Sequence, residues 1–228
     1  MLIEEITQDD STDAYRAIIN AIVTQKLAPS QKVSENIISE MFGLSRAISR
    51  NLIERLIAKQ FLVSISPRVT QVAPLTLLEI KQNFMLRKML LPEVVSLAAA
   101  KTDFVAVHKL NEEIQSIFPI ENDADALKVL KSNKRVNILM CEQAGYPLML
   151  EWINQLEDTA MRIYWLYVKA NKSFPYLTEQ HTASIDIVKN EEPARISAVI
   201  HDMISQTEER ILNTVFSHPQ FYTQDLKV

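Results

Sequence analysis

The scarcity of glycine is the feature of this sequence that most limits its fold. Only two of its 228 residues are glycine, Gly43 and Gly145, whereas nine are proline. Folds with many tight turns, and loops that cradle phosphates, need glycine where the backbone has positive φ. The chain therefore favours long helices joined at proline-marked corners. It also has no apolar run of about 18 residues, so we expect no membrane span.

Charge is distributed unevenly along the chain. The net charge is −4, but residues 14–75 contain eight Lys and Arg against three Asp and Glu, and residues 76–228 contain 16 against 20. A small basic module ahead of a larger acidic one is typical of a nucleic-acid-binding protein with a second role. The single cysteine, Cys141, is compatible with a reducing compartment. We expect a cytoplasmic protein.

Gly43 marks the centre of a predicted helix-turn-helix. Residues 35–42 form its first helix with Ser34 as the N-cap, and a left-handed glycine is a common way to end such a helix. Ser45 then caps a second helix, which begins at Arg46. A helix, a tight glycine-containing turn and a second helix are typical of proteins that read DNA.

The start of the second helix is a candidate DNA contact. Its spacing places Arg46, Ser49 and Arg50 on one side, away from the apolar stripe. In a DNA-binding helix-turn-helix these first turns meet base edges and phosphates, and a guanidinium can hold either with two hydrogen bonds. The alternative is that the two arginines only solvate a surface; their position after the turn favours DNA.

A predicted hairpin follows this helix. The β-branched runs 61–65 and 69–73 surround a Ser-Pro turn. A hairpin in this place is a wing, and Arg68 near its tip could reach a phosphate or the minor groove. Residues 1–75 therefore predict a winged helix-turn-helix DNA-binding domain.

Residues 26–72 resemble the winged-helix domain of the GntR family of bacterial transcription regulators. The matching residues are Pro29, Ser34, Glu35, Gly43, Ser45, Arg46 and Arg50. The chain has Ser30, Ile48, Gln60 and Val69 where the family usually has Gly, Pro, Gly and Gly. The resemblance implies a palindromic DNA operator as partner. With the helix pattern it predicts DNA contacts from Asn36, Ser45, Arg46, Ser49, Arg50 and Arg68.

No strand pattern appears after Pro74, so residues 76–228 predict an all-helical domain. Six helices are predicted, at about 76–101, 103–117, 123–144, 147–170, 174–190 and 192–216. The expected fold class is mainly α: a winged helix-turn-helix followed by a bundle of about six helices.

Residues 77–100 resemble the first helix of the FCD domain, the ligand-binding domain of the FadR-like branch of GntR regulators. The matching residues are Arg87, Leu90, Pro92, Ala98 and Ala99. The later "QAGYPLM" is similar to that branch's Ala-x-Gly-Asn-Pro-Leu-Leu. The resemblance implies that residues 76–228 form an effector-binding and dimerisation domain, in a homodimer that responds to a small-molecule effector.

Polar residues interrupt the apolar stripes of the predicted bundle. Asn133 and Asn137 lie on one stripe, and His181 lies on another. Buried polar groups must be hydrogen-bonded. They could line a ligand cavity between helices. Alternatively, each asparagine bonds a neighbouring helix and His181 is a core histidine.

Many members of this branch hold a divalent metal with one Asp or Asn and three histidines. By resemblance those positions fall on Asn133, Asn137, His181 and Met203. Only one imidazole remains, a poor ligand set for zinc or nickel, so we predict no metal and no cofactor. An organic effector would instead bind directly, with Arg87 and His181 as partners for a carboxylate. The predicted ligand-binding residues are Arg87, Asn133, Asn137, His181 and Met203.

Two alternatives stay open. The helical domain could only dimerise a DNA-binding protein, without sensing a ligand. A small helical enzyme is the other, but no Ser/His/Asp order, paired carboxylates or HExxH motif supports it. We therefore expect a regulator and not an enzyme.

Overall fold

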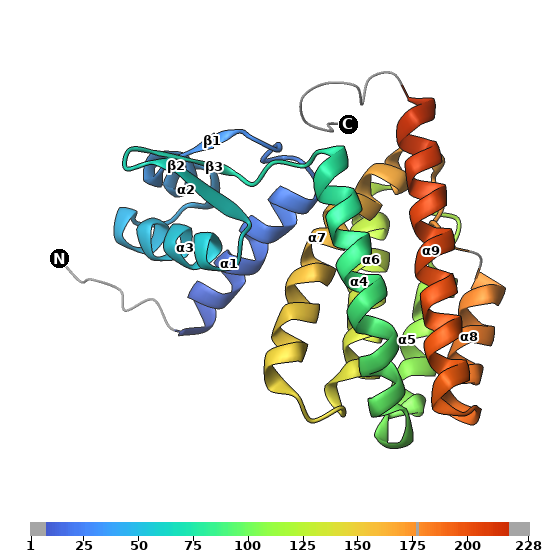
Figure 1. Cartoon of the computed structure of the whole chain (residues 1–228). Helices are drawn as coiled ribbons and strands as arrows, with labels where there is room; N and C mark the ends of the chain where they lie inside the picture. Colours follow the sequence, from blue (N-terminus) through green and yellow to red (C-terminus); the bar gives the residue numbers. More distant parts are fainter. Residues whose placement is uncertain (1–7, 177, 219–228) are drawn as a thin grey trace. The chain divides into compact units, whose positions relative to one another are not determined.

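The computed structural model describes residues 8–176 and 178–218 of the chain (Figure 1). The chain divides between Leu75 and Thr76 into two compact units, each treated separately below. The described residues are mainly helical, with one small sheet, and they confirm the predicted fold class. No helix in this part of the chain combines the length and the apolar character that a membrane crossing requires.

The first unit contains three helices and a three-stranded antiparallel sheet with strand order β1-β3-β2. The elements are α1 (Gln8–Val23), β1 (Lys32–Val33), α2 (Glu35–Phe42), α3 (Arg46–Ala58), β2 (Leu62–Ser66) and β3 (Val69–Val72). The hairpin β2–β3 confirms the predicted wing. Strand β1 was not predicted, because its two residues are too short to show a pattern; Lys32 and Val33 pair with Gln71 and Thr70.

The corner between α2 and α3 is held by local contacts that the sequence predicts. Gly43 ends α2 in the left-handed conformation, with φ 67° and ψ 31°, and its N–H donates to the Ser39 carbonyl. The Ser45 hydroxyl accepts from the Ile48 N–H at 3.3 Å, and Ser34 caps α2 in the same way. Each such cap contributes about 1 kcal/mol of helix stability.

Two departures from the GntR pattern lie at unusual backbone positions. Ser30 has φ 57° and Gln60 has φ 61°, so both adopt the left-handed conformation where the family usually has glycine. A side chain there costs about 1–2 kcal/mol relative to the right-handed conformation. Val69, the remaining position where the family usually has glycine, instead begins β3.

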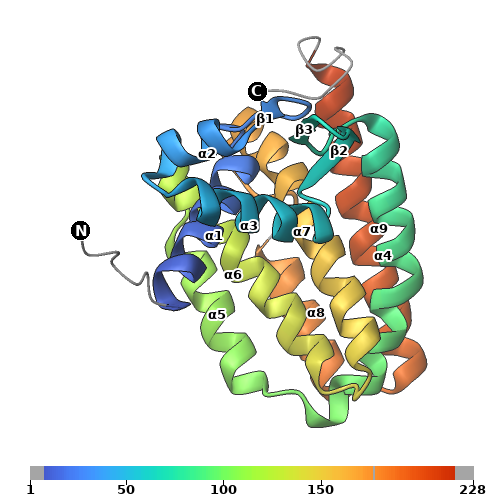
Figure 2. The same cartoon turned by 90° about the vertical axis from the view of Figure 1, so that its left-hand side faces the viewer.

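The second unit contains six α-helices among its described residues. They are α4 (Leu77–Ala98), α5 (Phe104–Ser116), α6 (Asp123–Glu142), α7 (Pro147–Asn171), α8 (Thr178–Asn190) and α9 (Pro193–Ser217), with a short 3-10 turn at Ala99–Lys101. Helix α4 packs against both α7 and α9 and runs alongside them (Figures 1 and 2). All six predicted helices are confirmed. Helix α8 begins four residues later than expected, and residues 219–228 lie outside the described residues.

Candidate nucleic-acid interface and ligand pocket

The start of α3 presents two arginines to solvent. The Ser45 cap and the left-handed turn at Gly43 set where the helix begins, so Arg46 and Arg50 lie in its first two turns. Arg50 forms a two-point contact with the carboxylate of Glu35: Nε to Oε1 at 2.6 Å and Nη2 to Oε2 at 3.2 Å. The hydrogen bond from Arg50, together with the charges of Arg50 and Arg46, lowers the pKa of Glu35.

The wing and the start of α2 contribute to the same region. A hollow of about 360 Å³ is lined by Glu35 and Asn36 from α2 and by Pro67 and Arg68 from the tip of the wing. The structure therefore brings Asn36 and Arg68 together, and Glu35 connects them to Arg50. Sequence reasoning matched Glu35 to the family but missed its pairing with Arg50.

The prediction for Ser49 is wrong. Asn36, Ser45, Arg46, Arg50 and Arg68 are exposed, but Ser49 has 0 % exposure. Ser49 precedes Leu52 by three residues and Ile53 by four, and residues at those spacings share a helix face. Both are core residues of the first unit, so Ser49 lies on the buried side of α3 and cannot reach DNA.

In the second unit, the five residues predicted to bind a ligand line one small internal cavity. Its volume is about 20 Å³, which is room for about one water molecule. The residues are Arg87 from α4, Asn133 and Asn137 from α6, His181 from α8 and Met203 from α9. The structure brings this set together, but around a space that is too small for an organic effector.

Arg87 already has a carboxylate partner inside the protein. Its Nη2 lies 2.8 Å from Oε1 of Glu157 on α7, and its Nη1 donates to the Tyr164 hydroxyl at 2.6 Å. Asn137 Nδ2 donates to the other oxygen of Glu157 at 2.8 Å. Burial raises the pKa of Tyr164, which keeps its hydroxyl protonated. The expected partner of Arg87 was a ligand carboxylate, whereas the structure places Glu157 there.

A signal for Glu157 is present in the sequence. It precedes Ala160 by three residues and Met161 by four, and it follows Ile153 by four, so it lies on the buried stripe of α7. A charged residue on such a stripe needs a buried partner. The pattern therefore marks Glu157 as part of a polar core network but does not identify Arg87 as its partner.

His181 is also held by contacts within the chain. Its Nδ1 lies 2.8 Å from Asn111 Oδ1, and its ring stacks on Tyr176 with centroids 4.5 Å apart. The Tyr176 hydroxyl in turn donates to Asn133 Oδ1 at 2.5 Å. Burial lowers the pKa of His181 to about 4, so the ring is neutral at neutral pH and its Nδ1–H donates to Asn111. These contacts match the alternative that bonded polar groups fill the core.

The residues at the family's metal positions do not fit a metal. The Asn133 oxygen accepts from Tyr176, Asn137 bonds Glu157, and Met203 supplies a thioether where an imidazole is usual. Within residues 8–176 and 178–218, no three His, Cys, Asp or Glu side chains cluster so as to hold a metal ion. A single neutral imidazole with two engaged amides is a weak donor set for zinc or nickel.

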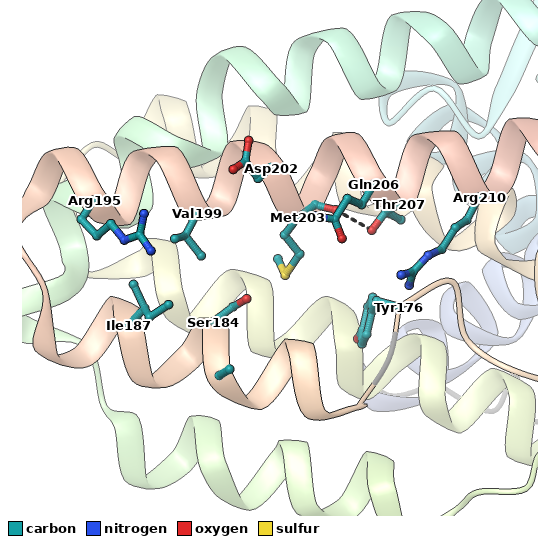
Figure 3. A pocket seen from close by; sticks show the side chains of 11 residues that line it. Tyr176, Ser184, Ile187, Arg195, Val199, Asp202, Met203, Gln206, Thr207 and Arg210 are labelled. Carbon is teal, nitrogen blue, oxygen red and sulfur yellow. Dashed lines mark hydrogen bonds between the residues drawn. The ribbon is translucent and has the colours of Figure 1, made fainter.

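A larger groove of about 280 Å³ opens between α8 and α9 (Figure 3). Helix α8 contributes Ser184 and Ile187 to its lining, and α9 contributes Arg195, Val199 and Arg210. Three further residues, Tyr176, Met203 and Thr207, line both this groove and the internal cavity. Of the five residues predicted to bind a ligand, only Met203 is in the described lining of this groove.

A winged helix-turn-helix joined to an all-helical unit is the architecture of two-part transcription regulators. A family model for the FCD domain matches residues 82–206, more than half of the chain. The chain therefore belongs to the FCD-domain family, the FadR-like branch of the GntR transcriptional regulators, which are not enzymes.

Solved structures share this fold. A GntR transcriptional regulator from Rhodococcus sp. RHA1 is 14 % identical with a TM-score of 0.72, over 90 % of this chain and 99 % of that one. The E. coli protein McbR/YncC is 15 % identical with a TM-score of 0.71, over 89 % and 97 %. A GntR family member from Pseudomonas syringae is 14 % identical with a TM-score of 0.52, over 91 % and 88 %. No curated protein sequence matches the chain.

Proposed function

We propose that this protein is a sequence-specific DNA-binding regulator whose helical unit dimerises and responds to a small organic ligand. Residues 1–75 would bind operator DNA, and residues 76–228 would carry the other two roles, in the bacterial cytoplasm. One observation carries the DNA-binding proposal: Arg46 and Arg50 are exposed at the start of α3, directly after the left-handed turn at Gly43.

The chemistry of this surface suits a DNA groove. A guanidinium at the start of a recognition helix can bind a guanine edge or a phosphate with two hydrogen bonds. The two-point contact of Arg50 with Glu35 shows the same geometry with a carboxylate. Because both side chains are solvent-exposed, a phosphate or base can replace Glu35 at little cost. Arg68 and Asn36 extend the surface toward the wing.

The test uses duplex DNA selected from a random library by the full chain. We expect the combined variant Arg46→Ala and Arg50→Ala to weaken binding to the selected duplex by at least about 100-fold, because two charged contacts are lost. Fluorescence anisotropy measures this affinity. Arg16→Ala is the matched control. Arg16 is exposed on α1, and among the described residues its only ion pair is with Asp13. Equal affinity of the double variant and the control would refute the assignment.

The proposed homodimer is supported by an uncovered apolar stripe on α4. Leu78, Met85, Leu86 and Met89 are 45–60 % exposed, while Phe84 on the other side of the helix is fully buried. A row of large apolar side chains exposed together on one helix face is typical of a protein–protein interface. A second copy with the same stripe would cover it around a two-fold axis, which also suits a palindromic operator.

Sedimentation of the purified chain tests this surface. We expect a dimer for the native sequence and a monomer for the combined variant Met85→Lys and Met89→Lys, because two ammonium groups would be buried without partners. Val105→Lys is the control, since Val105 on α5 is 82 % exposed and lies outside the stripe. A dimer that survives the double substitution would exclude α4 as its interface.

The proposed ligand response is supported by the connection between the groove and the internal cavity. Arg87, Asn133, Asn137, His181 and Met203 line the cavity, and Met203 also lines the groove. A ligand there would change operator affinity only if it bound one arrangement of the dimer more tightly than another. The change could not exceed that difference in binding free energy. The rival proposal, that the helical unit only dimerises, is favoured by the internal bonding of Arg87 and His181. It predicts no binding in the groove.

A further inference from the structure

We propose that Glu35 holds the guanidinium of Arg50 in the orientation that reads a guanine, and thereby determines which base is accepted at one position of the DNA. The inference rests on the proposed DNA binding and deepens it, because it names a residue that sets the specificity of that surface. Glu35 is a positioning residue in this account, since it acts on the base through Arg50.

The local backbone fixes where Glu35 lies. It is the first residue of α2, and the Ser34 hydroxyl caps that helix by accepting from the Ile37 N–H at 3.3 Å. A carboxylate in the first turn is favoured by the positive end of the helix dipole. The left-handed turn at Gly43 then brings Arg50 on α3 against this residue, 15 positions earlier in the chain. Two capped helix starts therefore hold the pair together.

The contact uses one edge of the Arg50 guanidinium and leaves another edge for a base. Nε donates to Oε1 of Glu35 at 2.6 Å, and Nη2 donates to Oε2 at 3.2 Å. These bonds use two of the five N–H groups of an arginine side chain. No second hydrogen-bond partner of the Arg50 side chain is present among the described residues. The outer end of the guanidinium therefore keeps one N–H on each Nη nitrogen, side by side.

Guanine is the base that fits this outer end. In the major groove it presents two neighbouring acceptors, O6 and N7, which bind two parallel N–H groups. Adenine presents an amino donor beside N7, cytosine presents an amino donor, and thymine presents one acceptor beside a methyl group. Arg50 can therefore bind guanine while Glu35 still holds it, whereas a phosphate that takes the inner edge must replace the carboxylate.

Such positioning changes specificity more than stability. The pair is solvated, so the contact itself contributes little to the folded state. A free arginine samples many rotamers and can contact a phosphate or several bases, and it loses that freedom on binding. Glu35 restricts Arg50 before DNA arrives and repels phosphates. It therefore disfavours complexes in which no guanine is read.

A second carboxylate allows positioning to be separated from charge. Glu54 follows Arg50 by four residues on α3. The hydrogen bond and the charge of Glu35 raise the pKa of Arg50, and the charge of Glu54 adds to this effect. Glu54 is exposed and makes no hydrogen bond to Arg50 among the described residues. If negative charge near Arg50 alone set the specificity, loss of Glu54 would act like loss of Glu35.

The test replaces each guanine of the selected duplex in turn by 7-deazaguanine, which pairs normally but has a C–H group in place of N7. Fluorescence anisotropy measures the affinity of the full chain. We expect one position at which the replacement weakens binding of the native chain about tenfold but that of Arg50→Ala less than about twofold. That position is the guanine read by Arg50. A selected duplex without such a position would overturn the proposal.

Variants of the two glutamates then test the positioning at that guanine. The loss of N7 should cost Glu35→Gln less than about threefold, because the amide oxygen can accept only in part where the carboxylate held Arg50 at two points. Glu35→Asp should restore part of the difference, because it keeps a carboxylate. Glu54→Gln is the matched control and should keep the tenfold effect. A tenfold effect in Glu35→Gln would overturn the positioning role. Equal reductions in Glu35→Gln and Glu54→Gln would assign the effect to charge and overturn it as well.

The same measurements distinguish failure of this inference from failure of the proposed function. If the native chain prefers the selected duplex and Arg50→Ala loses sensitivity to N7 while Glu35→Gln keeps it, only the positioning role of Glu35 fails. If the native chain binds the selected duplex no better than unselected DNA, the proposed function fails and the positioning role fails with it.

Discussion

Two arginine–glutamate pairs, one in each unit, have the same chemistry and opposite surroundings. The side chains of Arg50 and Glu35 are 67 % and 33 % exposed, whereas those of Arg87 and Glu157 are 3 % and 1 % exposed. Water solvates the exposed pair when it separates, so its partners can be exchanged. Separation of the buried pair would leave an uncompensated charge in the core. The first arrangement suits a surface that binds and releases an anionic partner, and the second fixes how α4, α6 and α7 pack.

Breaking the buried pair should give the largest effect. Glu157→Gln should lower the free energy of unfolding by about 3–5 kcal/mol, because the guanidinium of Arg87 would remain buried without its counter-charge. Chemical denaturation measures the change. The combined replacement Arg87→Met with Glu157→Leu should cost much less than the two single replacements added together. Additive costs would show that the two charges do not stabilise each other.

The pH dependence of stability should separate the buried histidine from exposed groups. Burial lowers the pKa of His181 from 6.5 to about 4. Between those values the unfolded chain binds more protons than the folded chain, so stability present above pH 6.5 is lost as pH falls toward 4. The full shift corresponds to roughly 3 kcal/mol. His181→Gln should flatten the curve of unfolding free energy between pH 6.5 and 5; an unchanged slope would contradict this account.

A smaller effect is expected in the first unit, where stability depends on backbone geometry. Gln60 follows α3 with φ 61°. Gln60→Gly should raise the free energy of unfolding by about 1 kcal/mol, because glycine adopts this conformation without strain while gaining some freedom in the unfolded chain. Gln60→Ala is the control and should show no such gain, since it keeps Cβ. Thermal unfolding distinguishes the two variants.

The two pairs also show what could be predicted from sequence. Gly43, Ser34 and Ser45 were predicted because a cap depends only on residues next to it in the chain. The six long helices follow from periodicity in the same way. Ser49 was placed wrongly because it lies at the boundary between the two faces of α3, where Leu52 and Ile53 decide its burial. The pairing of Arg87 with Glu157 joins positions 70 apart, and no local pattern specifies such a partner.

The exposed pair gives the smallest and most specific test of the comparison. Glu35→Gln should leave the unfolding midpoint unchanged within error, because both side chains are solvated when they separate. It should nevertheless raise the affinity for unselected duplex DNA a few-fold, since Arg50 becomes free to contact a phosphate and one repelling charge is lost. The plot of log affinity against log salt concentration should become steeper by about one unit, because one more counterion is released. Glu40→Gln, on the same helix, should change neither quantity, because Glu40 forms no ion pair among the described residues. A large loss of stability in Glu35→Gln would instead make the exposed pair structural, like the buried one.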